Sequence, residues 1–169
     1  MAIDIEPLGR HHDRTGFKCG RVELDEWFQR RAGQDERRNL ARVFIASDDG
    51  IGVIGFYSLS SFTLWLVDLP EELARKLPRY DAIPAALIGR LARDGRVRGK
   101  GVGELLLADA VKRILAAGQA LAVFAIVVDA KDARAAEFYE GFGFRRFPLH
   151  PGRLFMLTST AAAAVERAR

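Results

Sequence analysis

The sequence predicts an α/β (α+β) fold in which helices flank a mixed β-sheet. Strand and helix patterns alternate along the 169 residues, a glycine-rich turn joins a buried strand to an amphipathic helix, and no internal repeat or linker divides the chain. The length and the content of 49% hydrophobic and 28% charged residues fit one globular domain. We therefore expect a single domain over residues 1–160, followed by a C-terminal tail over residues 161–169.

The first part of the chain alternates strand and helix signals. Apolar and acidic residues alternate over Ile3–Leu8, which predicts a half-buried strand. A helix is predicted from Leu24 to about Leu40, with Trp27, Phe28 and Arg31 on one face. The further predictions are strands at Arg42–Ser47 and Val53–Trp65, joined by the turn residues Asp48-Asp49-Gly50, and a short helix that opens at Pro70–Leu73.

The middle of the chain contains a strand, the glycine-rich turn and a helix. Ala86–Arg93 is predicted as the central strand, after a loop bracketed by Pro78 and Pro84. Val102–Ala117 is predicted as a helix that Gly118 ends. Its apolar stripe consists of Leu107, Val111, Ile114 and Leu115, and we expect Asp109 and Arg113 on its solvent side.

The last part of the chain predicts a buried strand, a short helix and a closing hairpin. Leu121–Val128 is an uninterrupted apolar run, typical of a strand covered on both faces. Asp132 is predicted to cap a helix over Ala133–Glu140. The remaining predictions are Gly141 as the end of this helix, hairpin strands at Phe144–Phe147 and Arg153–Thr158, and a helical or frayed tail at Ala161–Arg169.

The glycine-rich turn, Arg98–Gly103, is the most informative segment. Glycines at every second position let the backbone bring its N–H groups together in front of a helix N-terminus, which favours a phosphate ligand. A nucleotide-binding P-loop needs Ser or Thr after Lys100, and neither is there; a dinucleotide fingerprint needs glycine where Glu104 stands. The spacing that does fit is R-x-x-G-x-G, although a plain turn between strand and helix remains open.

The positive charge of the chain favours an anionic partner but does not require one. The formal net charge is +4, and residues 75–100 contain eight Arg or Lys against two acids. This bias favours a polyanionic substrate or partner, while a solvated basic surface is an equally open interpretation.

Several classes of protein are excluded by what the sequence lacks. Cys19 stands alone, so no internal disulfide or cysteine-based metal cage is possible, and we expect no metal. No apolar run is long enough for a membrane span and no signal peptide opens the chain, so we expect a cytoplasmic protein without a membrane partner. His11, His12 and His150 lie outside every motif and are interpreted as solvated or loop histidines.

Two motifs together resemble a known superfamily. The pattern Arg98-x-x-Gly101-x-Gly103 resembles the pyrophosphate loop of the GNAT acyl-CoA-dependent N-acyltransferases, and Ala136–Phe144 (AEFYEGFGF) resembles the segment in which these enzymes present a tyrosine beside the thioester. The resemblance implies the GNAT fold, with a mixed, mostly antiparallel sheet of six or seven strands flanked by helices. It also implies acetyl-CoA as co-substrate.

The resemblance narrows to the GNAT toxins of type II toxin–antitoxin modules. It includes the segments FKCG, LDEWF, VIGFYSL and RLA, in that order along the chain. It implies acetylation of the α-amino group of aminoacyl-tRNA, a block of translation, a ribbon-helix-helix antitoxin as partner and a possible homodimer. Arg93 departs from the pattern, because an aliphatic residue usually follows Leu-Ala.

The resemblance also implies roles for individual residues. Tyr139 is the candidate catalytic residue, a general acid or hydrogen-bond donor to the departing thiolate. Contacts to tRNA are expected at Arg75, Lys76, Arg79 and Arg90. The expected acetyl-CoA contacts are Leu91, Ala92, Arg93, Arg98, Gly99, Lys100, Gly101, Val102, Gly103 and Phe138.

No general base is evident in the sequence. An α-amino group is about a tenth neutral at pH 7, whereas a lysine is neutral only about once in two thousand, so a site without a base suits an α-amine better. Two other functions stay open: acetylation of a small amine or a protein N-terminus, and an acyl-CoA-binding module without turnover.

Overall fold

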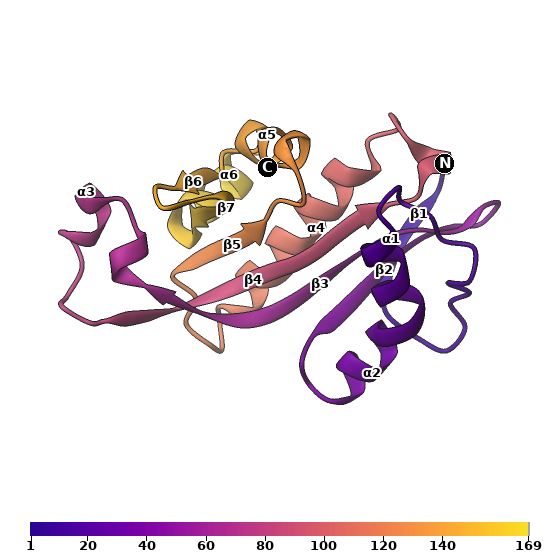
Figure 1. Ribbon diagram of the computed structural model, residues 1–169, viewed down its shortest axis with the longest axis horizontal. Helices are drawn as coiled ribbons and strands as arrows, with labels where there is room; N and C mark the ends of the chain where they lie inside the picture. Colours follow the sequence, from indigo (N-terminus) through magenta and orange to yellow (C-terminus); the bar gives the residue numbers. More distant parts are fainter. Residues whose placement is uncertain (169) are drawn as a thin grey trace. The chain divides into compact units, whose positions relative to one another are not determined.

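The structure, a computed structural model, describes residues 1–168 and contains a seven-stranded sheet in the order β1-β2-β3-β4-β5-β7-β6 (Figure 1). Strands β4 and β5 pair in parallel, while β1–β2, β2–β3, β5–β7 and β6–β7 are antiparallel. The expected mixed, mostly antiparallel sheet flanked by helices is thus confirmed. The residues group into two compact units, one of residues 1–60 and 89–110 and the other of residues 61–88 and the chain from 111 onward.

The first unit contains the N-terminal strands, the first helices and the glycine-rich turn. Its elements are β1 (Ile3–Pro7), α1 (Val22–Glu26), a π-helical turn (Trp27–Arg31), α2 (Ala32–Arg37), β2 (Arg42–Asp48), most of β3 (Gly52–Trp65), the end of β4 (Ala82–Arg93), a 3-10 turn (Gly95–Val97) and the first part of α4 (Val102–Ala117). Aromatic rings fill its core: Phe28 stacks on Phe56 with ring centroids 4.1 Å apart, and Phe17 meets Phe28 edge-on at 4.8 Å. These contacts hold the helical segment against β3.

The helix expected from Leu24 to about Leu40 is instead three pieces. Residues Trp27–Arg31 form a π-helical turn between α1 and α2, and the segment ends at Arg37. A π-turn contains more residues than an α-turn, so after it different sequence positions face the core. The prediction placed Arg31 on one face with Trp27 and Phe28, but those two residues and Ala32 are buried whereas Arg31 is exposed.

The helix α4 has the predicted bounds, Val102–Ala117. Leu107, Val111 and Ile114 are buried as expected. The interpretation of Asp109 as a solvent-side residue was incomplete, because its carboxylate accepts a hydrogen bond from the buried Tyr57 hydroxyl at 2.5 Å.

Gly55 lies at a point of close packing between β3, β4 and α4. A Cβ atom at this position would lie 2.9 Å from Leu106 Cδ1 and 3.1 Å from the carbonyl oxygen of Ala92. A side chain at this position would force Leu106 and the Ala92 backbone to shift, so glycine suits this close packing of β3 against β4 and α4.

Replacing Gly55 with alanine is expected to lower the free energy of unfolding by about 1–3 kcal/mol, because the added methyl group overpacks this contact. Gly16→Ala is the matched control, since nothing lies within 4 Å of a Cβ there. Urea denaturation of both variants measures the effect; equal stabilities would contradict the close packing.

The second unit contains the rest of β3, the start of β4, the rest of α4 and the C-terminal elements. These are a 3-10 turn (Leu66–Asp68), α3 (Glu71–Ala74), β5 (Ala125–Asp129), α5 (Ala133–Gly141), β6 (Arg145–Phe147), β7 (His150–Leu157) and α6 (Thr158–Arg167). Its core includes Phe147 and Phe155, whose ring centroids lie 4.9 Å apart, together with Leu64 and Val127.

Three predictions in this unit need correction. The predicted strand Leu121–Val128 begins only at Ala125, and Leu121 is exposed. Pro84 lies inside β4 rather than in a loop; its carbonyl oxygen accepts the Phe124 N–H, and proline is tolerated near a strand start because only its own N–H is missing. The tail forms α6 over Thr158–Arg167 with Ala161 buried, while residue 169 lies outside the described residues.

None of the helices within residues 1–168 combines the length and the apolar character needed to cross a membrane.

Candidate active site

The Asp94 carboxylate holds the turn between β4 and α4 in place through hydrogen bonds. This carboxylate is 2% exposed and accepts hydrogen bonds from the backbone N–H groups of Arg96 at 2.9 Å and Lys18 at 3.1 Å. Burial by itself raises the pKa of Asp94, but the hydrogen bonds from Arg96 and Lys18 outweigh it and hold the pKa below its ordinary value. Asp94 is therefore ionised at neutral pH, and it anchors the turn to the N-terminal loop.

Two glycines of the turn adopt a backbone conformation that disfavours side chains. Gly99 has φ +77° and Gly101 has φ +78°. Space is not the reason for glycine here, because nothing lies within 4 Å of a Cβ on Gly99 and only Glu104 Oε2, at 3.9 Å, approaches one on Gly101. The surface around Arg98–Gly101 is exposed, so a ligand can reach these amides.

The turn ends at the N-terminus of α4, where Val102 is buried and Gly103 half-buried. The first N–H groups of a helix have no acceptor within the helix, and the helix dipole favours an anion beside them. Arg98 and Lys100 add two exposed cations on the same turn. The turn thus offers amides and positive charge to a diphosphate.

The preceding strand segment, Leu91–Arg93, leads directly into this turn. Ala92 is buried, and Leu91 and Arg93 are half-buried. Two contacts hold the neighbouring Arg90. Its backbone N–H donates to the buried Ser58 Oγ at 3.1 Å, and its guanidinium lies 4.0 Å from the centroid of the Trp27 ring. Arg90 is therefore held in place rather than free on the surface.

Tyr139 and Phe138 lie in the second unit, on α5. Asp132 caps this helix as predicted, because its side chain accepts the Ala135 N–H at 2.8 Å. Tyr139 is 5% exposed, and its ring packs edge-on against Phe144 at 5.8 Å and Phe138 at 5.3 Å. The Tyr139 hydroxyl has no hydrogen-bond partner anywhere in the described part of the chain, so it is available to a ligand.

The surroundings of Tyr139 keep its hydroxyl protonated. Burial raises the pKa of this phenol well above its ordinary value, and the negative charge of Asp129 raises it further. Asp129 is itself held by Arg153, whose Nε and Nη2 lie 2.7 and 3.3 Å from its two carboxylate oxygens. Tyr139 is thus suited to donate a hydrogen bond at neutral pH.

The other predicted tRNA contacts lie in the second unit around α3. Arg75, Lys76 and Arg79 are exposed, and Arg75 pairs with Glu71 at 3.0 Å. The acetyl-CoA residues from Leu91 to Gly103 belong to the first unit, as does Arg90, so the predicted residues fall into one group in each unit.

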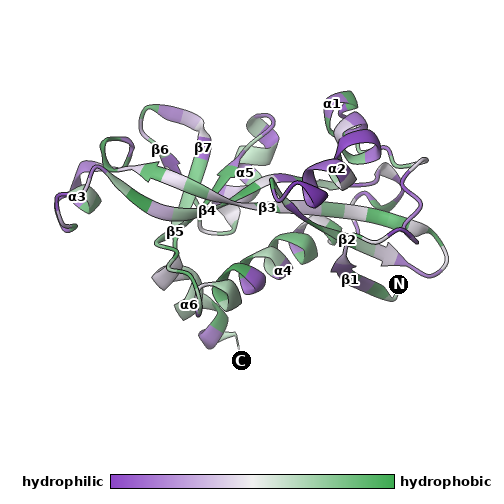
Figure 2. Cartoon of the chain, turned by 90° about the horizontal axis from the view of Figure 1, so that it is seen from below, coloured by the Kyte–Doolittle hydropathy of each residue, from purple (hydrophilic) through white to green (hydrophobic). Residues whose placement is uncertain are grey.

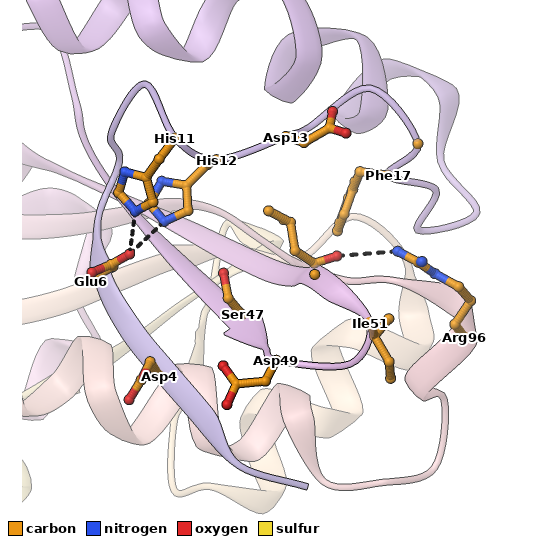
Figure 3. Close-up of a pocket in the computed structure, with 13 residues that line it drawn as sticks. Asp4, Glu6, His11, His12, Asp13, Phe17, Ser47, Asp49, Ile51 and Arg96 are labelled. Carbon is orange, nitrogen blue, oxygen red and sulfur yellow. Dashed lines mark hydrogen bonds and ion pairs between the residues drawn. The ribbon is translucent and has the colours of Figure 1, made fainter.

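Sequence reasoning missed a histidine cluster in the first unit. Glu6 Oε1 accepts hydrogen bonds from His11 Nε2 at 2.7 Å and His12 Nε2 at 2.9 Å, on the wall of an open cavity of about 390 Å³ (Figure 3). His12 lies in the loop after β1, in line with its interpretation as a solvated or loop histidine, but its side chain is buried rather than solvated. The only signal in the sequence was the His11-His12 pair itself, five residues after an acidic strand residue.

The side chains of this cluster are of the types that bind zinc, but the hydrogen bond at His12 Nδ1 disfavours a metal on His12 Nε2. The three side chains converge on one point. However, the Gly9 N–H donates to His12 Nδ1 at 2.9 Å, so the proton of the neutral ring is on Nε2 and points at Glu6. A metal on Nε2 would place a proton on Nδ1, against the Gly9 N–H. The cluster therefore fits a hydrogen-bonded latch that holds the loop after β1.

The latch predicts a stability that depends on pH. The hydrogen bonds from His11 and His12 lower the pKa of Glu6. A carboxylate with a lowered pKa stabilises the fold above its unfolded pKa, near 4.3, and loses this contribution as the pH falls through its lower folded pKa. The stability advantage of wild type over Glu6→Gln should therefore be full at pH 6 and shrink below pH ~4. Unfolding by urea across this range measures it, and a difference independent of pH would contradict it.

Comparison with known protein families gives one family match. The acetyltransferase (GNAT) domain matches residues 39–146.

Two curated relatives match nearly the whole chain. The probable toxin TacT of Sinorhizobium fredii (strain NGR234) is 35% identical over 165 residues, which cover 92% of this chain and 91% of the relative. A tRNA-acetylating toxin of Mycobacterium tuberculosis (strain H37Rv) is 35% identical over 153 residues, which cover 90% of each.

Solved structures give the same result. AtaT complexed with acetyl-methionyl-tRNAfMet superposes with a TM-score of 0.89 at 26% identity and covers 97% of this chain and 99% of that one. AtaTR bound with AcCoA has a TM-score of 0.83 at 26% identity, and the match covers 96% of this chain and 98% of that one.

Proposed function

This chain belongs to the acetyltransferase (GNAT) family, and we propose that it is the toxin of a type II toxin–antitoxin system, which transfers an acetyl group from acetyl-CoA to the α-amino group of aminoacyl-tRNA and so blocks translation. The observation that carries this proposal is the likeness to a tRNA-acetylating toxin along 90% of both chains. The AtaT complex with acetyl-methionyl-tRNAfMet supports the same product class. Residues 1–160 then act as one acetyltransferase domain.

Acetyl-CoA is the co-substrate, and the first unit supplies the groups that would hold it. Within Gly99–Gly103 the glycine and Val102 amides receive its diphosphate, since the Lys100 N–H donates to the Val97 carbonyl at 3.2 Å. The Arg98 and Lys100 side chains add charge-assisted hydrogen bonds. The pantetheine amides pair with the backbone of Leu91–Arg93, and an N–H there polarises the thioester carbonyl. Phe138 lies against the cofactor beside Tyr139. The free space around Gly99 and Gly101 and the hydrogen bond from the Lys18 N–H to Asp94, which anchors the turn, support this assignment.

Tyr139 assists the departure of the thiolate. The neutral amine nitrogen attacks the thioester carbon, the carbon–sulfur bond breaks, and coenzyme A leaves as a thiolate. The nitrogen loses one proton as the amide forms, and the thiolate takes up one proton to become the thiol. Even for an ordinary phenol, with a pKa near 10, giving its proton to a thiolate whose conjugate thiol has a pKa near 8.5 would cost about 2 kcal/mol. Because burial and Asp129 raise the pKa of Tyr139, the hydroxyl donates a hydrogen bond to the forming thiolate rather than losing its proton early.

The acceptor needs no strong base. The α-amino group of an aminoacyl ester is partly neutral at pH 7, so the reactive form is present in solution. Arg75, Lys76, Arg79 and Arg90 contribute positive charge that attracts the phosphate backbone of tRNA without reading its sequence.

Partners and location follow from the same proposal. The chain binds an antitoxin of the ribbon-helix-helix class, which keeps it inactive, and forms a homodimer when released. Because charged tRNA is used in the cytoplasm, the protein acts there. The structure of the AtaT Y144F mutant toxin bound to the C-terminus of the antitoxin AtaR supports an antitoxin as partner.

A direct assay tests this function. Purified protein is incubated with labelled acetyl-CoA and total tRNA, either charged or deacylated. Label in the charged tRNA alone supports the proposal. Label in neither sample, together with turnover of free amines, would replace it with a small-amine acetyltransferase.

A further inference from the structure

A serine side chain takes part in the pairing of β3 with β4. Ser58 is 2% exposed, and its Oγ accepts the backbone N–H of Arg90 at 3.1 Å. On its other side, Ser58 stands opposite Val43 in the antiparallel β2–β3 ladder, which is regular from Arg42 to Ala46. The hydroxyl therefore belongs to a firmly paired strand and holds one N–H group of the next strand.

Strand β4 is one residue longer than the stretch of β3 beside it. The Asp94 N–H donates to the Ile54 carbonyl oxygen at 2.7 Å, and the Leu66 N–H donates to the Asp81 carbonyl oxygen at 3.1 Å. Counted between these two bonds, β4 has one residue more than β3, which indicates a β-bulge. A bulge takes its extra residue out of the regular ladder, so the N–H of that residue needs another acceptor. The Arg90 N–H, which donates to a side chain, lies between the two bonds and fits this position.

The Ser58 hydroxyl lies on the face of β3 that packs against the first helices. Side chains alternate between the two faces of a strand. Tyr57 points to the other face, because its hydroxyl donates to Asp109 on α4, whereas Phe56 stacks on Phe28. By this alternation Ser58 shares the face of Phe56, and Figure 2 shows α1 and α2 on one side of this part of the sheet and α4 on the other. Because Ser58 is buried there, water cannot readily take the place of its hydroxyl.

The hydrogen bond at Arg90 fixes the direction of the backbone groups that follow. In an antiparallel ladder the N–H groups of a strand point alternately to its two edges. Arg90 and Asp94 both donate toward β3, so the N–H groups of Leu91 and Arg93 point to the opposite edge of β4. Pairing of that edge with β5 covers Ala85–Ile88 and no later residue of β4 within residues 1–168. The Leu91 and Arg93 N–H groups are thus presented to a ligand rather than to a strand.

We propose that the Ser58 hydroxyl is a positioning group for acetyl-CoA. By holding the Arg90 N–H it keeps the next peptide from rotating, and it thereby directs the Leu91 N–H toward the thioester carbonyl. A donor that polarises a carbonyl must be aligned before the reaction begins, and such alignment comes from the groups that support it. The proposal rests on the proposed function in its assignment of Leu91–Arg93 to the pantetheine arm and the thioester. Ser58 acts through Arg90 and is itself buried in the sheet.

Two substitutions at Ser58 and one control test the proposal. Ser58→Ala deletes the hydroxyl, and Ser58→Cys fills a similar space with a sulfur that accepts hydrogen bonds weakly. Ser60→Ala is the control, because Ser60 is a half-buried serine of the same strand whose side chain has no hydrogen bond in the described chain. Circular dichroism shows which variants fold. Amide hydrogen exchange by NMR, the KM for acetyl-CoA and the single-turnover rate constant at saturating acetyl-CoA are then measured on each folded variant.

In a folded Ser58 variant we expect the Arg90 amide to exchange about tenfold faster relative to the Asp94 amide, whose backbone bond remains. The rate constant should fall about tenfold, less than the ~10²–10³ typical of removing such a donor, because the donor is misaligned and not lost. The KM for acetyl-CoA should change by less than about threefold, since the turn that binds the diphosphate is unaltered. A wild-type rate constant, an equal fall in Ser60→Ala, or failure of both Ser58 variants to fold would overturn the proposal.

The outcome separates this inference from the proposed function, because the rate is measured with charged tRNA and with a free amine as acceptors. If the wild-type protein acetylates charged tRNA and the folded Ser58 variants do so at the same rate, only the inference fails. If the wild-type protein acetylates only the free amine and the Ser58 variants lose that rate, the proposed function fails and the inference holds. The Arg90 exchange needs no acceptor, so unchanged exchange in a folded Ser58 variant overturns the inference whichever acceptor the protein uses.

Discussion

Replacing Tyr139 with phenylalanine is expected to lower kcat by about 10²–10⁴, the effect typical of losing a group that transfers or shares a proton. The KM for acetyl-CoA should change little, because the ring and its packing against Phe144 remain. The fold should also remain stable, since the hydroxyl has no partner within residues 1–168 that the change would leave unpaired.

Single-turnover transfer and acetyl-CoA binding by calorimetry together measure this result. Tyr80→Phe is the matched control, because Tyr80 is an exposed tyrosine of the same unit. Near-normal turnover by Tyr139→Phe would remove the hydroxyl from the mechanism and leave the ring with a packing role only.

Replacing Gly99 with valine is expected to raise the KM for acetyl-CoA about tenfold or more. A β-branched residue is strained at φ +77°, so the turn changes conformation and its amides no longer point toward the diphosphate. The effect should appear in the binding of coenzyme A itself, which lacks the acetyl group, because the diphosphate is common to both.

Gly52→Val separates ligand binding from backbone strain. Gly52, the first residue of β3, has φ +95°, and nothing lies within 4 Å of a Cβ there, as at Gly99. Both variants should lose similar stability, but only Gly99→Val should lose affinity for acetyl-CoA. Equal KM values in the two variants would contradict a diphosphate site at the turn.

The sequence predicted those parts of the fold that depend on neighbouring residues. The α4 bounds, the Asp132 cap and the β2–β3 turn follow from local patterns, and the structure confirms them. The start of β5 was wrong because an apolar run does not say where pairing begins: Leu121 is apolar but exposed, and the ladder starts at Ala125. Only the partner strand fixes that position.

The site was predictable to the extent that it lies in short motifs. The positive φ of Gly99 and Gly101 agrees with the reasoning from glycine spacing. The support behind the motifs was not predictable, because it joins distant residues: Asp94 accepts from Lys18, and Asp129 is held by Arg153. The exposure of Arg31 was not predictable either, because a π-helical turn shifts the face that this segment turns toward the core.

The most direct test of the proposed function is to identify the atom that becomes acetylated. Charged tRNA treated with the protein and acetyl-CoA is deacylated in mild base, and the released amino acids are analysed by mass spectrometry. We expect amino acids that carry the acetyl group on the α-nitrogen. Unmodified amino acids, or an acetyl group on a side chain or on the RNA itself, would contradict an aminoacyl-tRNA N-acetyltransferase.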